Sequence, residues 1–392
     1  MELRHATAPY FRQRESMQSI GLSRLAAAGA LLIPALFVYG FRALLMALSG
    51  VAGAALLETV WQYIRRKEPT LNDLSAVYTG LMCALLLPVS APVWLPFVAA
   101  AFAIAVIKLP FGGFGRSPFS PEAGGVCFAI MVGARLLSRY NSAYLSPIQQ
   151  QIFASLPDRV FGHNDQSLPL IGDVICTPDI SDMLSTQITL RAGLDPKLNV
   201  WGLLFTGVEG AMGMAVAVLP LVCALWLMLR RVFAWQSAAA YAVTLPVLSL
   251  FVRWEGVSLG EMPLYELMTG SALLCAVFIA GDIFTAPHTG SGRALYGLCA
   301  GVLTVIFRRV GSSEYGEVFA LLLMNAAASP LDHFVYYCRS RGISLAAYRH
   351  KISNYFKKKF GSKGRFDIDV DELYEELERE KREKKRQGGQ NR

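Results

Sequence analysis

Polar and helix-breaking residues interrupt the apolar sequence at four places, and the first runs from Asp73 to Gly80. It brings the carboxylate of Asp73 and the hydroxyls of Ser75 and Thr79 to the start of an apolar run. A carboxylate and two hydroxyls at the beginning of a helix could bind the polar edge of a ligand. The alternative is structural: Asp73 caps the helix while the two hydroxyls bond the backbone.

The second place is a turn that runs from Phe111 to Glu122 and contains three glycines and two prolines. Gly112 and Gly113 are the first two of these glycines. The free backbone N–H groups of such a turn can meet a phosphate or a planar ring. An ordinary connecting loop is the alternative, and the sequence leaves both interpretations open.

Acidic and amide side chains mark the third and fourth places. Asp282 and Thr285 stand at the end of an apolar run, where a carboxylate usually faces a cavity or a partner chain. Asn325 and Asp332 lie in the last apolar run. Both are candidates for bonds between helices and for an ion path, and helix–helix bonding is the favoured interpretation for Asn325.

The elements that must position these residues are transmembrane helices. Hydrophobic residues make up 54% of the 392-residue chain, charged residues only 17%, and the mean hydropathy is +0.39. In a typical soluble protein roughly a quarter of the residues are charged. The low charge of this chain therefore indicates a surface that faces lipid. The first apolar run is not a signal peptide, because it continues into the second without a small-residue cleavage site. The predicted spans are 22–40, 42–62, 76–91, 93–109, 120–138, 202–229, 232–252, 266–284, 293–308 and 316–338.

We predict an all-α polytopic membrane protein with about ten transmembrane helices, arranged as two inverted five-helix repeats around a large extracytoplasmic loop. An odd number of crossings in each group inverts the second group and places a binding site between the halves. A short likeness between 79–85 and 269–276 supports the repeat. The predicted divisions are a cytoplasmic N-terminal segment (1–21), a first transmembrane block (22–139), an extracytoplasmic loop (140–201), a second transmembrane block (202–338) and a cytoplasmic charged tail (339–392).

The net charge of +8 indicates contact with a lipid bilayer rather than with nucleic acid. Lys and Arg gather at the N-terminus, in short loops and in the tail, as an anionic cytoplasmic leaflet favours. This balance predicts that both termini are cytoplasmic. The residues counted on that side include Arg4, Arg12, Arg14, Arg24, Arg65, Arg66, Lys67, Lys108, Arg230, Arg231 and Arg293, against Arg42, Arg135, Arg139, Arg253, Arg308 and Arg309 on the other side.

The seven cysteines do not predict a metal site. No two of them have C-x-x-C spacing, and all but Cys176 lie in apolar segments or at their edges. Cysteines in such positions behave as small buried hydrophobes. The sequence also lacks a dinucleotide-binding fingerprint, so no metal ligands and no catalytic residues are predicted within this chain.

The four polar segments, in this order, resemble the D subunit of the Rnf electron-transport complex and the related B subunit of the sodium-pumping NADH:quinone reductase. The likeness extends from Ala8 through about Asp332 and is weak in the outer loop. The matched motifs are Asp-x-Ser-Ala-x-x-Thr-Gly (73–80), Phe-Gly-Gly-x-Gly with Pro-Phe-x-Pro (111–121), Asp-x-x-Thr-x-Pro (282–287) and Leu-Met-Asn-Ala (323–326).

The resemblance implies a flavin-carrying subunit of a complex in the bacterial cytoplasmic membrane. Such a complex passes electrons between ferredoxin and NAD, moves sodium ions or protons, and contains further membrane and peripheral subunits. The resemblance also implies FMN esterified through its phosphate to a Thr of the outer loop. The family motif Ser-Gly-Ala-Thr reads Ser185-Thr186-Gln187-Ile188 here, so Thr189 or Thr186 is the candidate only if the local register differs.

A non-covalent flavin is expected near Asp73 to Thr79, where the polar groups are retained, and riboflavin or a second flavin is the further cofactor considered. Two Asn of the family's turn are Ser117 and Ser120 here, and a Met replaces a Glu in the Gly-rich run 207–214. The residues expected to bind flavin are Asp73, Ser75, Thr79, Gly112, Gly113, Ser185, Thr186, Thr189, Asp282 and Thr285.

Two other functions stay open at this stage. One is a solute transporter or channel that uses the same scaffold without flavin, and the altered Ser-Gly-Ala-Thr segment favours it. The other is a purely structural anchor. The retained Asp73, Ser75, Thr79 and glycine-rich turn favour a subunit of a redox-driven ion translocase, which is not expected to be active alone.

Overall fold

The computed structural model describes residues 17–66, 73–89, 91–137, 211–251, 262–268, 270–310 and 315–340. Every regular element in these ranges is helical, and none of them forms a β-strand. The chain divides into two compact units, Met1–Tyr336 and Tyr337–Arg392. By length and composition, four described helices can cross a membrane: Met17–Tyr39, Phe41–Arg65, Gly290–Arg309 and Gly316–Cys338. The fold therefore agrees with the predicted all-α membrane protein.

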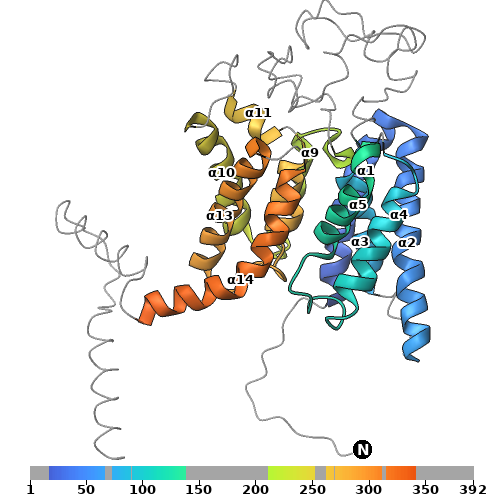
Figure 1. Cartoon of the computed structure of the whole chain (residues 1–392), viewed down its shortest axis with the longest axis horizontal. Coiled ribbons are helices and arrows are strands. Elements are labelled where there is room, and N and C mark those ends of the chain that lie inside the picture. The colour runs from blue at the N-terminus through green and yellow to red at the C-terminus, as the bar shows by residue number, and fades with distance from the viewer. Residues whose placement is uncertain are drawn as a thin grey trace, which may run out of the picture. The chain divides into compact units, whose positions relative to one another are not determined.

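The first group of helices stands side by side (Figure 1). α2 packs along both α3 and α4, and α5 packs on α4. The last turns of the fourth segment are a π-helix, η2, which contains one residue more per turn than an α-helix. The members are α1 (Met17–Tyr39), α2 (Phe41–Arg65), α3 (Ser75–Leu86), α4 (Leu95–Phe102), η2 (Ala103–Lys108) and α5 (Pro121–Leu137).

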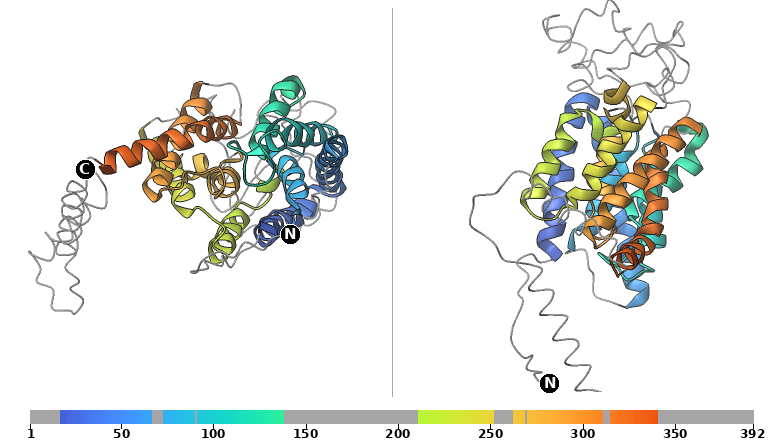
Figure 2. Two further views of the ribbon diagram at one scale, coloured as in Figure 1. Left: turned by 90° about the horizontal axis from the view of Figure 1, so that it is seen from below. Right: turned by 90° about the vertical axis from the view of Figure 1, so that its left-hand side faces the viewer.

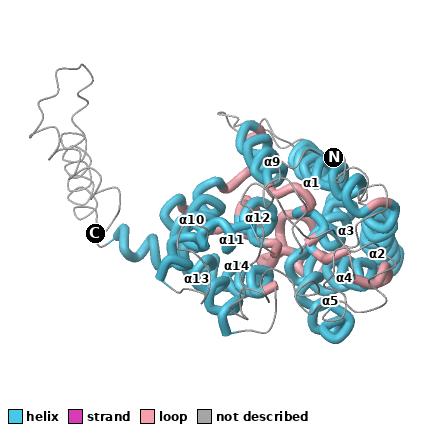
Figure 3. Tube along the Cα trace, turned by 90° about the horizontal axis from the view of Figure 1, so that it is seen from above, coloured by secondary structure: helices cyan, strands magenta, loops and turns pink. Residues whose placement is uncertain are grey.

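The second group stands together beside the first (Figures 1 and 2). α10 lies along α13, while α9 packs on α1 and joins the groups. Viewed from above, α12 lies between the α10–α13 pair and the first group (Figure 3). The members are η5 (Met212–Met214), α9 (Val218–Leu229), α10 (Trp235–Phe251), α11 (Met262–Met268), α12 (Ala272–Cys275), the π-helix η6 (Ala276–Ala280), α13 (Gly290–Val310) and α14 (Gly316–Ser340).

Close backbone contact holds α2 against α3, and it depends on two glycines. A Cβ atom built on Gly80 would lie 2.5 Å from the carbonyl oxygen of Gly50 and 2.8 Å from the Cα of Val51. Helix pairs in membranes use small residues in this way, because lipid supplies no hydrophobic force to press the helices together. α3 is consequently buried over nearly its whole length.

The predicted span 266–284 is wrong as a continuous helix. It is broken between α11 and α12 at Gly270, whose φ of 71° departs from the helical range. The next backbone N–H, that of Ser271, donates to the carboxylate of Glu317 at 2.7 Å instead of to a helical carbonyl. Broken backbone is tolerated at membrane depth where protein groups satisfy it, and Glu317 does so here.

Candidate functional site

A small pocket lies where the first group of helices meets the segment after η6. Its walls come from α1, α3, the end of η2, the turn before α5 and the residues 282–285. Three of the four polar places of the sequence therefore meet at one pocket, although the first and the third lie far apart along the chain.

Four of the predicted flavin-binding residues line this pocket: Thr79, Gly113, Asp282 and Thr285. The Thr79 hydroxyl donates to the carbonyl of Ser75 at 2.9 Å, one helical turn earlier. Thr285 is buried, and its Oγ1 has no hydrogen-bond partner among the described residues. A buried hydroxyl without a partner is costly in apolar surroundings, so Thr285 offers a bond to a ligand.

The remaining predicted residues within the described ranges, Gly112, Asp73 and Ser75, do not line the pocket. Gly112 precedes Gly113 in the turn. Asp73 does not cap α3: the N-cap position is Leu74, and no side-chain capping bond is formed. The structural interpretation of Asp73 as a helix cap is therefore wrong.

Positive φ angles shape the glycine-rich turn. Gly112, Gly113 and Gly115 have φ values of 105°, 95° and 76°, which side chains rarely permit. A Cβ atom on Gly115 would lie 3.1 Å from the ring of Phe284, and the rings of Phe114 and Phe284 meet edge to face at 5.0 Å between centroids. The glycines thus bring the turn against the 282–285 segment and give the pocket an aromatic wall.

Arg24 of α1 is the central charge of the pocket. One of its guanidinium nitrogens lies 3.2 Å from Asp282 Oδ2 and 3.5 Å from Glu122 Oε1. The same nitrogen donates to the hydroxyl of Tyr78 at 3.1 Å, and the guanidinium carbon lies 4.5 Å from that ring's centroid. All three charged side chains are buried: Arg24 is 7% exposed, Asp282 4% and Glu122 2%. A single buried cation therefore neutralises only one of two buried carboxylates.

A second buried ion pair flanks the pocket. Lys108 ends η2, and its ammonium lies 2.8 Å from Glu58 Oε2 of α2. Both side chains are at most 4% exposed. Since Lys108 and Glu58 neutralise each other, they leave the charge balance around Arg24 unchanged.

Arg24, Tyr78, Lys108 and Glu122 are pocket residues that the sequence interpretation misses. It places Arg24 and Lys108 among cytoplasmic loop charges, but both lie inside helices and are buried in ion pairs. A charged residue within an apolar run of a membrane protein normally faces the interior and finds a partner, and this signal could have found them. The identity of each partner depends on the packing of the helices and is not visible in the sequence.

The fourth polar place lies apart from the pocket and joins helices. Asn325 of α14 donates to the hydroxyl of Ser120 and accepts a bond from Tyr296 of α13 at 2.6 Å. Asp332 accepts bonds from the backbone N–H groups of His288 and Thr289 at 2.8 and 3.1 Å. The helix–helix interpretation of Asn325 is confirmed.

Ser185, Thr186 and Thr189 lie outside the described residues, so the covalent site stays a prediction. Within the described ranges, no three His, Cys, Asp or Glu side chains are placed to hold a metal ion. The pocket instead combines aromatic rings, positive-φ backbone and a few polar groups, as binding sites for small molecules commonly do.

Comparison with known proteins identifies the family of the chain. The D subunit of the Na(+)-translocating ferredoxin:NAD(+) oxidoreductase complex of Acetobacterium woodii is 28% identical over 334 residues, which cover 85% of this chain and 94% of that protein. The D subunit of the ion-translocating oxidoreductase complex of Pseudomonas paraeruginosa is 31% identical over 353 residues (87% and 96%), and its Escherichia coli counterpart is 27% identical over 350 residues (87% and 98%). The family model described as NQR2, RnfD, RnfE matches residues 4–339, and the chain belongs to this family.

Proposed function

We propose that this chain is the flavin-carrying membrane subunit of a complex that couples electron transfer of the ferredoxin/NAD class to translocation of sodium ions or protons. The names of its relatives support the complex and the coupling. The observation that carries the flavin is the convergence of Thr79, Gly113, Asp282 and Thr285 on one pocket. Other membrane and peripheral subunits of an Rnf-type complex are its proposed partners.

FMN or riboflavin is the proposed ligand, because the residues of the pocket offer groups that an isoalloxazine ring can contact. Phe114, Phe119 and Phe284 line the pocket and offer apolar faces. The buried Thr285 hydroxyl can bond the polar edge of the ring. Arg24 supplies a positive charge at the same pocket, and nearby charge is one means by which a protein tunes the potential of a flavin. When bound, the flavin supplies the electron-carrying chemistry.

Fixed partners hold the charged side chains of the pocket in place. The backbone N–H of Phe284 donates to Asp282 Oδ1 at 3.1 Å, while Asp282 Oδ2 faces Arg24. Arg24 is also held by the hydroxyl of Tyr78. Side chains whose rotamers are locked in this way keep a binding site preorganised.

The proposed architecture is ten crossings in two inverted halves, in the bacterial cytoplasmic membrane, with both termini in the cytoplasm. Two matched local structures support the repeat. Ser75 begins α3 after a residue with φ of 54°, and Ser271 precedes α12 after a residue with φ of 71°. Glu122 and Glu317 stand in the first turns of α5 and α14, which would be the last crossings of the two halves.

The test is the flavin content of the complex purified after co-expression of all its subunits. We expect flavin to be released on denaturation, and we expect Thr285→Val to lower the non-covalent fraction. Ultraviolet fluorescence of the denatured chain on a gel would report the proposed covalent FMN, and its loss in Thr189→Ala or Thr186→Ala would identify the attachment residue. Complexes that assemble fully and release no flavin would refute the proposal.

A flavin-free solute transporter or channel is the second candidate function. The departure from Ser-Gly-Ala-Thr at residues 185–188 favours it. Flux of a solute or ion through proteoliposomes that hold this chain alone, without any electron donor, would support the transporter and contradict the redox subunit.

A further inference from the structure

We propose that the end of α9, together with the start of α1, binds one anionic phospholipid. Arg230 and Arg231 hold the phosphate of its headgroup, while Trp226 and the exposed apolar side of α9 contact an acyl chain. Neither arginine lines the pocket. The inference therefore goes beyond the proposed redox function and does not require that the pocket hold a flavin.

The first observation is a pair of exposed, adjacent arginines that face no carboxylate. Arg230 Nε donates to the hydroxyl of Ser23 of α1 at 3.3 Å, and the guanidinium carbon lies 5.8 Å from the centroid of a Trp226 ring. Among the described residues, neither Arg230 nor Arg231 has an ion-pair partner. The helices α1, α9 and α10 contain no Asp or Glu. These guanidinium groups can therefore donate to a phosphate from outside the chain.

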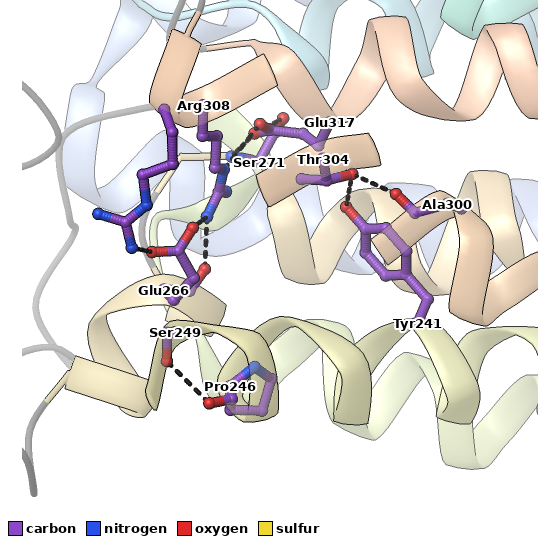
Figure 4. A network of polar contacts seen from close by, with 10 residues as sticks. Tyr241, Pro246, Ser249, Glu266, Ser271, Ala300, Thr304, Arg308 and Glu317 are labelled. Atoms are coloured by element: carbon purple, nitrogen blue, oxygen red, sulfur yellow. Dashed lines mark hydrogen bonds and ion pairs between the residues drawn. The ribbon is translucent and has the colours of Figure 1, made fainter. Parts of the chain in front are cut away.

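A contrasting pair of arginines ends α13. Arg308 lies 3.3 Å from Glu266 and 3.2 Å from Glu317 (Figure 4). Arg309 lies 3.2 Å from Glu266. Two cations thus meet two carboxylates inside the protein, as buried charges require. At the end of α9 the described chain supplies two cations and no anion, which is the arrangement of basic sites that bind anionic headgroups.

The second observation is the backbone conformation of Arg231. Its φ is 57°, in the left-handed region where glycine is strongly favoured. The backbone N–H of Arg231 donates to the carbonyl of Met228 at 3.0 Å, and that of Val232 to the carbonyl of Leu227 at 3.1 Å. Helices that end with these two bonds usually place a glycine at the left-handed position. An arginine there, at the cost of backbone strain, indicates a role for its side chain.

The third observation is the apolar surface that continues from the two arginines. Viewed from above, α9 stands beside α1 at the edge of the bundle (Figure 3). Trp226 and Trp235 are about half exposed at this end, as Trp side chains at a membrane–water interface are. The 12 residues of α9 extend about 18 Å, close to the hydrocarbon depth of one leaflet, about 15 Å. The exposed apolar side chains along this length are Leu22, Leu221, Val222, Leu225, Met228 and Leu229.

The experiment counts the phospholipids that the purified complex retains, by native mass spectrometry in detergent that contains phosphatidylglycerol and phosphatidylcholine with identical acyl chains. Wild-type complex should retain one phosphatidylglycerol that Arg231→Gly and Arg230→Gln each bind about fivefold more weakly, the usual effect of one cation near an anionic headgroup. In lipid-free detergent, Arg231→Gly should leave the thermal midpoint unchanged or raise it, because glycine suits the left-handed position. Loss of lipid without loss of stability separates headgroup binding from a role in folding.

Arg66→Gly is the matched control. Arg66 is also exposed and has a left-handed φ of 50° directly after α2, so both substitutions remove one cation from the same kind of backbone. Only the site on α9 includes a hydroxyl from a second helix, that of Ser23. Arg66→Gly should therefore leave the affinity for phosphatidylglycerol within about twofold. Equal losses in Arg66→Gly and Arg231→Gly would show a diffuse attraction to the membrane and would overturn the site.

Free phosphate and a partner subunit are the competing occupants. Phosphatidylglycerol should raise the thermal midpoint of the wild-type complex, because a ligand that binds only the folded state stabilises it. Inorganic phosphate, at an ionic strength matched with chloride, should not, since it has no acyl chain to bury. An equal rise with inorganic phosphate would overturn the lipid assignment. Loss of a subunit in Arg231→Gly, with the count of phosphatidylglycerol unchanged, would place a protein interface on α9 instead.

Discussion

At the residue scale, the pocket depends on how Arg24 is shared between Glu122 and Asp282. Removing one partner of a buried ion pair destabilises a protein more than the pair itself stabilises it, because a charge is left buried and uncompensated. Arg24 is also packed over the ring of Tyr78. Its guanidinium therefore serves charge balance and packing together.

The first prediction concerns this guanidinium. Arg24→Gln should lower the free energy of unfolding by about 3–5 kcal/mol, the usual penalty for an uncompensated buried charge. Arg65→Gln is the control, because Arg65 lies at the exposed end of α2 and should change stability by less than about 0.5 kcal/mol. Denaturant unfolding in detergent gives both values. Equal effects of the two substitutions would contradict the assigned role of Arg24.

The second prediction concerns the unpaired hydroxyl of Thr285. Thr285→Val keeps the shape of the side chain and should weaken non-covalent flavin binding by about three- to tenfold, the equivalent of one hydrogen bond. Thr59→Val is the matched control, since the Thr59 hydroxyl bonds carbonyls of its own helix α2. Titration of flavin into depleted complex measures the affinity. An unchanged affinity in Thr285→Val would exclude this hydroxyl as a ligand.

Sequence motifs predict the pocket residues that belong to short, recognisable patterns. Each of these residues stands in a short run where glycine, proline or polar residues interrupt the apolar sequence: Thr79, Gly113, Asp282 and Thr285. Arg24 cannot be found in this way, because an isolated charge near the end of an apolar run looks like a loop residue until its partners are known. Those partners come from α5 and from the segment after η6, and only tertiary packing brings them to α1.

At the element scale, the helices are held by close backbone contacts and by bonds between helix ends. Most helices are predictable from the sequence, since length and hydropathy locate apolar spans. The break between α11 and α12 is not. Gly270 permits that break, but the bonds that stabilise it come from Glu317, which is 47 residues further along the chain.

The third prediction tests the contact between α2 and α3. Gly80→Ala should destabilise the protein by about 1–3 kcal/mol, because backbone atoms surround the new methyl group and cannot easily move aside. Gly29→Ala offers a matched control within α1, where a Cβ atom meets nothing within 4 Å. That control should be neutral or stabilising by up to about 1 kcal/mol, as helix propensity favours Ala. Thermal unfolding of both variants is the measurement, and similar midpoints would refute the role of Gly80.

The fourth prediction concerns the link between α14 and the start of α13. Asp332→Ala should destabilise the protein by at least about 2 kcal/mol, because backbone N–H groups at a helix start lose a charged acceptor. Asp332→Asn keeps one acceptor oxygen and should recover part of this stability. If ion translocation by the assembled complex falls equally in both variants while stability differs, Asp332 would act in an ion path instead.

At the scale of the whole molecule, buried ion pairs explain exceptions to the distribution of positive charge. If both termini are cytoplasmic, Arg308 and Arg309 fall on the outer side of the membrane, where few cations are expected. Both, however, pair with Glu266 inside the protein. Arg42 donates to the carbonyls of Val89 and Ala91. Such residues carry less information about orientation than cations in free loops, because internal partners determine where they lie.

The fifth prediction tests the orientation. A fluorescent protein fused after Arg392 should fold and fluoresce, because the C-terminus is expected in the cytoplasm, whereas alkaline phosphatase fused after Leu137 should be active on the outer side. Exchanging the two reporters should give inactive fusions. Activity of phosphatase at the C-terminus would reverse the topology and would place the 140–201 segment inside.

The π-helix η2 determines the direction in which Lys108 meets Glu58. A π-helical turn holds an extra residue, and in an α-helix each residue advances the side chains by about 100° around the axis. Deleting one residue between Ala103 and Ile107 would let an ordinary α-helical turn replace the π turn, and Lys108 would still face α2. If all six residues of η2 instead formed an α-helix, the side chains after them would be rotated by about 100° and the ammonium would turn away from Glu58. The extra residue and the π-helical bonding that accommodates it therefore work as a pair, and neither alone would keep Lys108 in its ion pair.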